Sequence, residues 1–193
     1  MKISITITVL LSICWKHTSG QFIEYEKIQI DEVLIETGEF SNYYAYDLGD
    51  FIFYNGRYEN NLTFKIVKKE SQQIVYSYRD SISDAMIHIP MFFSNDKRSK
   101  IVILVEVAAE SSWGQEVLLI SKGIVNYLGY LNYTIDNEIG ESISEYCHIT
   151  EQNNKMILGF EDISIICWDE NAKRINGKEL KFELGMDGIR KVK

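Results

Sequence analysis

The sequence contains a single proline, Pro90, together with three cysteines and 12 glycines among its 193 residues. This scarcity excludes collagen-like, proline-rich and densely disulfide-bonded scaffolds. Hydrophobic residues make up 46% of the chain and charged residues 25%, close to the average for globular proteins, which excludes disorder as the main state. The length corresponds to one domain, or to two very small domains at most. Three tryptophans, 12 tyrosines and 9 phenylalanines are a rich supply of aromatic side chains for a β-sheet core.

The N-terminus has the features of a signal peptide. Lys2 gives a positive start, and residues 3–14 are uncharged and mainly apolar. A run of this length matches the ~7–15 residues of a signal-peptide core and falls short of the ~17–25 needed to span a bilayer. Thr18 and Gly20 are small residues at positions −3 and −1 if cleavage precedes Gln21. We therefore expect residues 1–20 to be removed and residues 21–193 to form a single exported domain.

Two alternatives remain for this segment. Ile3, Ile5, Ile7 and Val9 alternate with polar residues, as they would in a first buried strand. Cys14 could also be acylated after cleavage, but lipoprotein signals normally place a small residue before the cysteine, and here that residue is Ile13. We expect a periplasmic, cell-surface or extracellular protein, with a lipid anchor at Cys14 as the minor alternative.

The exported chain would be acidic. Without Lys2 and Lys16 it has 18 basic and 28 acidic residues, a net charge of −10. Nucleic acids and anionic lipid headgroups are bound through clustered Lys and Arg, and the basic clusters at 65–69 and 190–193 are short and interrupted. The charge therefore excludes nucleic acid as a partner.

Alternation with a period of two residues dominates the chain, and a long stripe with the helical period of 3.6 is absent. This pattern predicts an all-β fold, an antiparallel meander that forms a sandwich or a partly open barrel. A small propeller-like arrangement of three- or four-stranded units is the alternative, although no repeated signature supports it. Strands are expected near residues 51–54, 62–66, 74–78, 101–107, 116–120, 123–127, 128–135, 145–150, 155–160, 163–168, 178–184 and 188–192.

Local signals predict how some of these strands connect. Asn55-Gly56 is typical of a tight hairpin turn, and residues 62–78 suit a second hairpin around a polar connection. The continuous aliphatic run 101–107 suits a central strand that is covered on both faces. Residues 80–100, which contain Pro90, suit a loop, with a seam between two halves of the domain near 94–100. Residues 22–36 have mixed periodicity and receive no assignment.

Cys147 and Cys167 both lie on apolar faces of their expected strands. In a regular meander one strand separates them by about 10 Å, beyond the ~7 Å limit for a disulfide, so the geometry favours two buried thiols over a Cys147–Cys167 bridge. Adjacent strand residues point to opposite faces, so Cys147 and His148 do not form a nucleophile–base pair. His88 is interpreted as a structural histidine. No spacing typical of a zinc site occurs, and we expect neither a metal nor a cofactor.

Glu106 and Glu110 are weak candidates for catalysis. Glu106 lies within the aliphatic strand, and Trp113 follows Glu110 by three residues. Glycosidases use two carboxyl groups, often beside an aromatic platform, so this region could belong to a carboxylate-dependent glycan hydrolase. The simpler interpretation is that Glu106 marks the end of a strand and that Trp113 covers the edge of the core.

The same turn is the candidate binding surface. Glu110, Ser112 and Trp113 follow a central strand, which is a firm platform for recognition, and Gly114 permits unusual backbone angles. Tyrosines suit protein and glycan partners alike. No motif in the chain identifies a named chemistry. The sequence therefore favours an exported, non-enzymatic binding protein. Its expected partner is a protein or a cell-envelope component such as a glycan. The alternative function is the glycan hydrolase.

Overall fold

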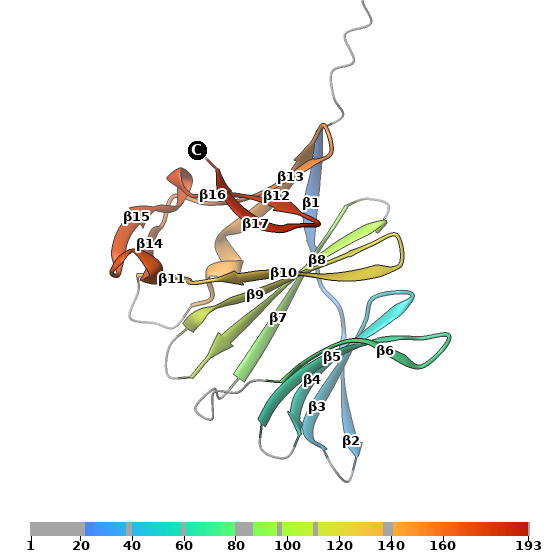
Figure 1. Cartoon of the computed structure of the whole chain (residues 1–193). Coiled ribbons are helices and arrows are strands. Elements are labelled where there is room, and N and C mark those ends of the chain that lie inside the picture. The colour runs from blue at the N-terminus through green and yellow to red at the C-terminus, as the bar shows by residue number, and fades with distance from the viewer. Residues whose placement is uncertain are drawn as a thin grey trace, which may run out of the picture.

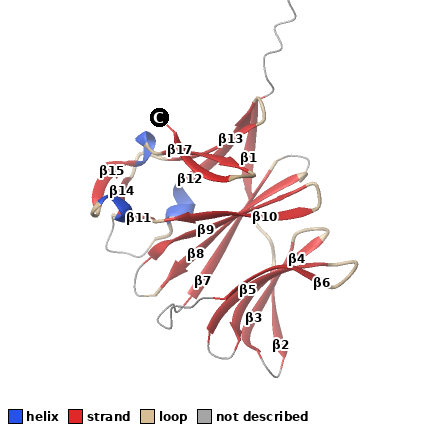
Figure 2. Ribbon diagram, viewed as in Figure 1, coloured by secondary structure: helices blue, strands red, loops and turns tan. Residues whose placement is uncertain are grey.

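The computed structural model describes residues 22–37, 40–58, 61–79, 87–95, 98–109, 112–136 and 141–192. These residues form antiparallel strands and the short 3₁₀ segments η1 (Ile143–Tyr146), η2 (Trp168–Glu170) and η3 (Gly177–Glu179), with no α-helix among them (Figure 2). The predicted all-β antiparallel fold is confirmed. Within the described ranges, no helix has the length and apolar character needed to cross a membrane.

The largest sheet has nine strands and curls on itself (Figure 1). Its last strand comes back to its first, because a Cβ atom placed on Gly129 of the first strand would lie 3.6 Å from Ile189 of the last. The sheet is therefore a nearly closed barrel. In spatial order its strands are β10 (Ile124–Leu131), β9 (Ser112–Ser121), β8 (Lys100–Ala108), β7 (Ile87–Ser94), β1 (Phe22–Ile28), β12 (Cys147–Gln152), β13 (Lys155–Phe160), β16 (Lys181–Gly185) and β17 (Gly188–Val192).

A second sheet of five strands packs against the outer face of β7–β10 (Figure 1). It is a sequential meander of β2 (Glu32–Thr37), β3 (Phe40–Asp47), β4 (Phe51–Tyr58), β5 (Asn61–Lys68) and β6 (Gln73–Arg79). A third sheet of three short strands joins β11 (Tyr133–Ile135), β14 (Ser164–Cys167) and β15 (Lys173–Asn176). The fold thus combines a sandwich with a barrel, and β7–β10 belong to both.

Strand β8 explains why these two cores form. Val102 and Leu104 point into the barrel, whereas Ile103 and Val105 point toward the five-stranded sheet, and all four are buried. Each such side chain contributes about 1.5–3 kcal/mol when it leaves water. The predicted central strand covered on both faces is confirmed, and so is the hairpin over 62–78, formed by β5 and β6.

The turn predicted at Asn55-Gly56 is wrong. Strand β4 continues through both residues to Tyr58, which pairs with Asn61 of β5. Asn55 is buried, and its side-chain Nδ2 donates a hydrogen bond of 2.8 Å to the carbonyl oxygen of His88 in β7. The amide thus has a partner in the facing sheet, and this tertiary contact outweighs the local turn preference.

Pro90 lies inside β7, so the predicted loop over 80–100 is wrong for residues 87–94. Strand β7 pairs with β8 on one side, where Pro90 lies opposite Val105. On its other side, β7 pairs with β1 through residues 92–94, and Pro90 is not part of that pairing. The His88 carbonyl points away from β8, toward Asn55. Backbone groups two residues apart in a strand point to the same side, so the nitrogen of Pro90 also points away from β8. A proline is tolerated there because its missing N–H costs no hydrogen bond of the sheet.

The strands after β13 do not continue a simple meander. Strand β13 pairs with β16, and β14 instead pairs with β11 and β15 in the third sheet. The assumption behind the predicted spacing of Cys147 and Cys167 is therefore wrong. Strand β15 was not predicted, because Ile175 is its one apolar residue. Residues 94–100, the predicted seam, connect β7 to β8, which pair along their length.

Candidate binding cleft

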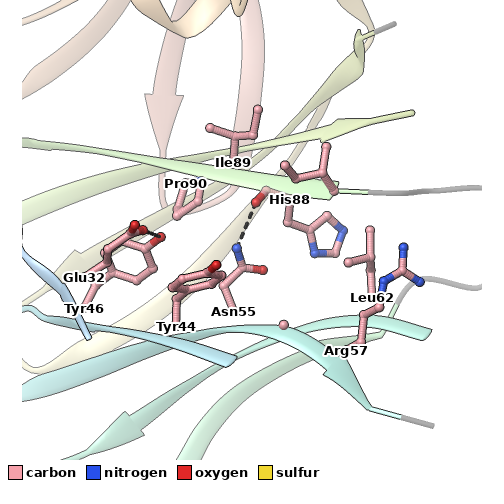
Figure 3. Close-up of a pocket in the computed structure, with 11 residues that line it drawn as sticks. Glu32, Tyr44, Tyr46, Asn55, Arg57, Leu62, His88, Ile89 and Pro90 are labelled. Carbon is pink, nitrogen blue, oxygen red and sulfur yellow. Dashed lines mark hydrogen bonds between the residues drawn. The ribbon is translucent and has the colours of Figure 1, made fainter. Parts of the chain in front are cut away.

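A cleft of about 540 Å³ lies between the five-stranded sheet and β7 (Figure 3). Its volume falls within the ~300–1,000 Å³ typical of small-ligand sites. Polar and aromatic side chains from β2–β4 form one wall, and the start of β7 forms the other. The described lining residues are Glu32, Tyr44, Tyr46, Asn55, Gly56, Arg57, Leu62, Ile87, His88, Ile89 and Pro90.

Asn55 and His88 form the floor of the cleft. The Asn55 side chain projects from the inner face of β4 and binds the His88 backbone through Nδ2. Its Oδ1 atom is buried and accepts no hydrogen bond from any described residue. The His88 ring packs edge-on against Phe64 and Tyr78, with centroids 5.5 and 5.9 Å apart. A buried amide oxygen without a donor is costly, so the floor of the cleft favours a ligand that donates a hydrogen bond.

Tyr44, Tyr46 and Glu32 form the polar wall. The Tyr46 hydroxyl donates a 3.0 Å hydrogen bond to Glu32 Oε2, and burial together with this bond raises the pKa of Tyr46 well above its usual value. Tyr46 therefore stays neutral and holds the carboxylate at the wall. Glu32 Oε1 and the hydroxyl of the half-buried Tyr44 have no partner among the described residues. Both groups are available to a ligand.

The apolar part of the lining is small. Pro90 of β7 lies between the sheets beside Tyr46, and Leu62 of β5 projects toward β7 (Figure 3). Ile87 and Ile89 alternate with His88 and Pro90 along β7, so their side chains, 46% and 39% exposed, lie on the other face of the strand, and Figure 3 shows Ile89 directed away from Tyr44. The cleft is thus amphiphilic, with hydrogen-bonding groups beside a limited hydrocarbon surface.

Trp113, the predicted binding residue, lies beside this cleft rather than in it. Its partly buried ring packs against Val107 and against Leu62, and Leu62 lines the cleft. Gly114 has a φ of +138°, and the Trp113 carbonyl accepts a 2.6 Å hydrogen bond from Tyr130. These contacts fix Trp113 over the edge of the two sheets. Ser112 begins β9 with its Oγ atom buried, and Glu110 lies outside the described residues.

Glu106 faces away from the cleft. It lies on the barrel side of β8, is 2% exposed, and pairs across the strands with the equally buried Gln115 of β9. Glu106 Oε2 and Gln115 Nε2 have no hydrogen-bond partner in the described part of the chain. The structure therefore places Glu106 inside the fold, on the opposite face of the sheet from Trp113.

Cys147 and Cys167 are free cysteines. Burial raises the pKa of the Cys147 thiol to about 12, although the nearby Lys27 ammonium opposes the rise, and Sγ donates a 3.3 Å hydrogen bond to the Ser144 carbonyl. The thiol is therefore protonated at neutral pH and is a poor nucleophile. The neighbouring His148 is exposed, and its ring lies over Gly159 of β13. A Cβ atom added to Gly159 would lie 2.6 Å from His148 Nε2.

No group of three or more His, Cys, Asp or Glu side chains within the described ranges could hold a metal ion. Comparisons of the chain with protein-family models, with curated proteins and with solved structures find no match. The geometry of the cleft is therefore the basis for assigning a function.

Proposed function

We propose that the chain is an exported, non-enzymatic binding protein whose ligand enters the cleft between β7 and the five-stranded sheet. The observation that carries this proposal is the side chain of Asn55, a residue that lines the cleft and whose buried Oδ1 atom has no donor among the described residues. A binding site typically combines apolar surface with a few convergent polar groups, and this cleft has both.

The size of the cleft favours a particular kind of partner. A stable protein interface covers about 800 Å² on each side and needs a broad surface. A recess of about 540 Å³ instead fits a small molecule or the end group of a larger one. We therefore favour a cell-envelope component over the flat face of a protein.

The positions of the carboxylates favour binding over hydrolysis. A glycoside hydrolase uses two carboxyl groups that flank the scissile bond. Glu32 is the one carboxylate among the described lining residues, and Glu106 is buried on the far side of β8. Hydrolysis requires a second carboxyl group, and the described lining of the proposed site does not contain one.

Export is part of the proposal and has its own test. The basic start, the apolar run and the small residues before Gln21 support it. Intact-mass analysis of the protein from the exported fraction should give a chain that begins at Gln21, or at an acylated Cys14. Folded cytosolic protein that retains Met1 would contradict export.

A panel of small probe molecules can locate the binding site. ¹⁵N-labelled exported protein is titrated with methyl glycosides, short uncharged peptides and phosphocholine, and amide shifts are followed by NMR. We expect the shifts to cluster at Tyr44, Asn55 and His88. Shifts confined to other regions, or none with any probe, would contradict the proposal. Release of sugar from a glycan substrate that Glu106→Gln abolishes would favour the hydrolase instead.

A further inference from the structure

We infer that the cleft is selective for a neutral saccharide, an inference that rests on the proposed function. The available polar groups point to a ligand rich in donors. Asn55 Oδ1 and Glu32 Oε1 can only accept hydrogen bonds, and both lack a donor among the described residues. The Tyr44 hydroxyl can donate or accept. A ligand that satisfies this set must present at least two donors.

These acceptors lie along one wall, at different depths. Asn55 is 6% exposed and lies at the floor, whereas Glu32 is an exposed residue near the mouth, where it is held by Tyr46 (Figure 3). Tyr44 contributes to the same wall between these two groups. One sugar ring carries several hydroxyl groups, so a single saccharide supplies a donor for more than one of these acceptors. A ligand with a single donor would leave one of the acceptors unsatisfied.

The apolar lining matches the other side of such a ring. Sugars carry C–H groups on their ring faces and hydroxyls around their edges. Pro90 offers hydrocarbon opposite the tyrosines of β3, and Leu62 adds to it from β5, so a ring placed between the sheets meets apolar surface and acceptors at the same time. Tyrosine adds to this match, since it combines an apolar ring with a polar tip.

The charges of the lining favour a neutral ligand over an ion. The described lining residues include one acid, Glu32, and one base, Arg57. A site for an amine cation would have a net negative lining, and a phosphate site would have several basic groups. Because the charges of the lining balance, the cleft favours neither a cation nor an anion. Its specificity then depends on hydrogen bonds.

The test compares probes and matched variants. Methyl glycosides of glucose, galactose, mannose and N-acetylglucosamine are titrated against the exported protein, with n-butylamine and tetramethylammonium as cationic probes. Glu32→Gln and Tyr44→Phe each change one group on the wall. Glu179→Gln and Tyr76→Phe are the controls, because Glu179 is exposed outside the cleft and Tyr76 is half-buried on the same sheet without lining it.

We expect at least one glycoside to bind, and Glu32→Gln and Tyr44→Phe each to weaken it by about two- to tenfold, the range of a single hydrogen bond. The controls should leave affinity unchanged. Amines that bind in place of sugars, with the same dependence on Glu32, would overturn the saccharide inference but leave the cleft as a binding site. Sugar binding that none of the variants changes, or no sugar binding at all, would also overturn it. Shifts at Asn55 and His88 with the peptides or phosphocholine would then show whether the proposed function survives.

Discussion

The Tyr25 hydroxyl donates a 2.7 Å hydrogen bond to Glu151 at the point where β1 changes its partner strand. Residues 22–25 of β1 pair with β12, and residues 26–28 pair with β7. Lys100 at the start of β8 holds the second oxygen of the same carboxylate at 2.6 Å. Glu151 is buried, so these contacts connect the two halves of the nine-stranded sheet away from water. Strands β1, β8 and β12 thus meet at one buried carboxylate.

We expect Glu151→Gln to destabilise the protein in a pH-dependent way. Burial alone would raise the pKa of Glu151, but the hydrogen bonds from Lys100 and Tyr25 outweigh it and lower the pKa. A carboxyl whose pKa is lowered on folding stabilises the protein above its unfolded pKa, and this contribution is lost as the pH falls through the folded pKa. Hydrogen bonds to a charged group contribute about 1.5–3 kcal/mol, which sets the expected loss at pH 7.

Thermal unfolding of wild type and Glu151→Gln from pH 7 to pH 3 measures this effect. The difference in melting temperature should be largest at neutral pH and should shrink below about pH 4.5. Glu183→Gln, which changes an exposed ion pair with Arg190, is the control and should shift stability by less than about 1 kcal/mol. A difference between wild type and Glu151→Gln that stays constant across the pH range would show that the carboxylate charge is irrelevant.

Gly114→Ala should destabilise the protein strongly. Gly114 has a φ of +138°, and a Cβ atom there would lie 2.4 Å from the Leu131 carbonyl oxygen, a backbone atom that cannot move aside cheaply. Gly49 also has a positive φ, of +85°, but no atom lies within 4 Å of its added Cβ. Gly49→Ala therefore isolates the backbone penalty, about 1–2 kcal/mol. Urea unfolding should give a clearly larger loss for Gly114→Ala, and equal losses would contradict the predicted clash.

Trp113→Ala should cost stability and affect binding only indirectly. The ring is partly buried against Val107 and Leu62, so we expect a loss of about 1–3 kcal/mol, below the ~3–5 kcal/mol of a fully buried tryptophan. Trp168→Ala is the control, because Trp168 is 48% exposed and forms one side-chain hydrogen bond, to Thr134. If Trp113→Ala abolished ligand binding at unchanged stability, Trp113 would be a contact residue.

Cys147 should resist alkylation in the folded protein. A thiol whose pKa is raised to about 12 contains very little thiolate at pH 7.5, and the thiolate is the reactive form. Intact-mass analysis after iodoacetamide should show no adduct on folded Cys167→Ser protein that begins at Gln21, in which Cys147 is the one remaining cysteine, and rapid modification in urea. Rapid labelling without denaturant would show that the thiol is exposed and ionised.

Some elements follow directly from the sequence, because their signal is local. The aliphatic run of β8 predicts a strand covered on both faces, and the polar residues 69–72 predict the turn between β5 and β6. Pairings between distant residues leave no such signal. Tyr25 and Glu151 are 126 residues apart in the chain, and the partner of Asn55 is 33 residues away. Local turn preference therefore gives the wrong result at Asn55-Gly56.

The cleft was missed for the same reason, since its walls come from strands that meet only in the folded protein. One signal could have indicated it. Asn55 continues the alternating row of Phe51 and Phe53, so a polar amide occupies a position that faces the core. A polar residue at a core-facing position needs either a buried hydrogen-bond partner or a ligand. Among the described residues, Asn55 has a partner for Nδ2 but none for Oδ1.

The side-chain amide of Asn55 gives the most direct test of the claim that the cleft binds a ligand. Its two Nδ2 protons give an NMR signal that reports on the amide, whose Oδ1 atom has no described donor in the free protein. During titration with a methyl glycoside that binds, this signal should shift together with the backbone amide of His88, because a ligand hydroxyl then donates to Oδ1. Saturable binding that leaves both signals unchanged would contradict the account and place the binding site elsewhere on the molecule.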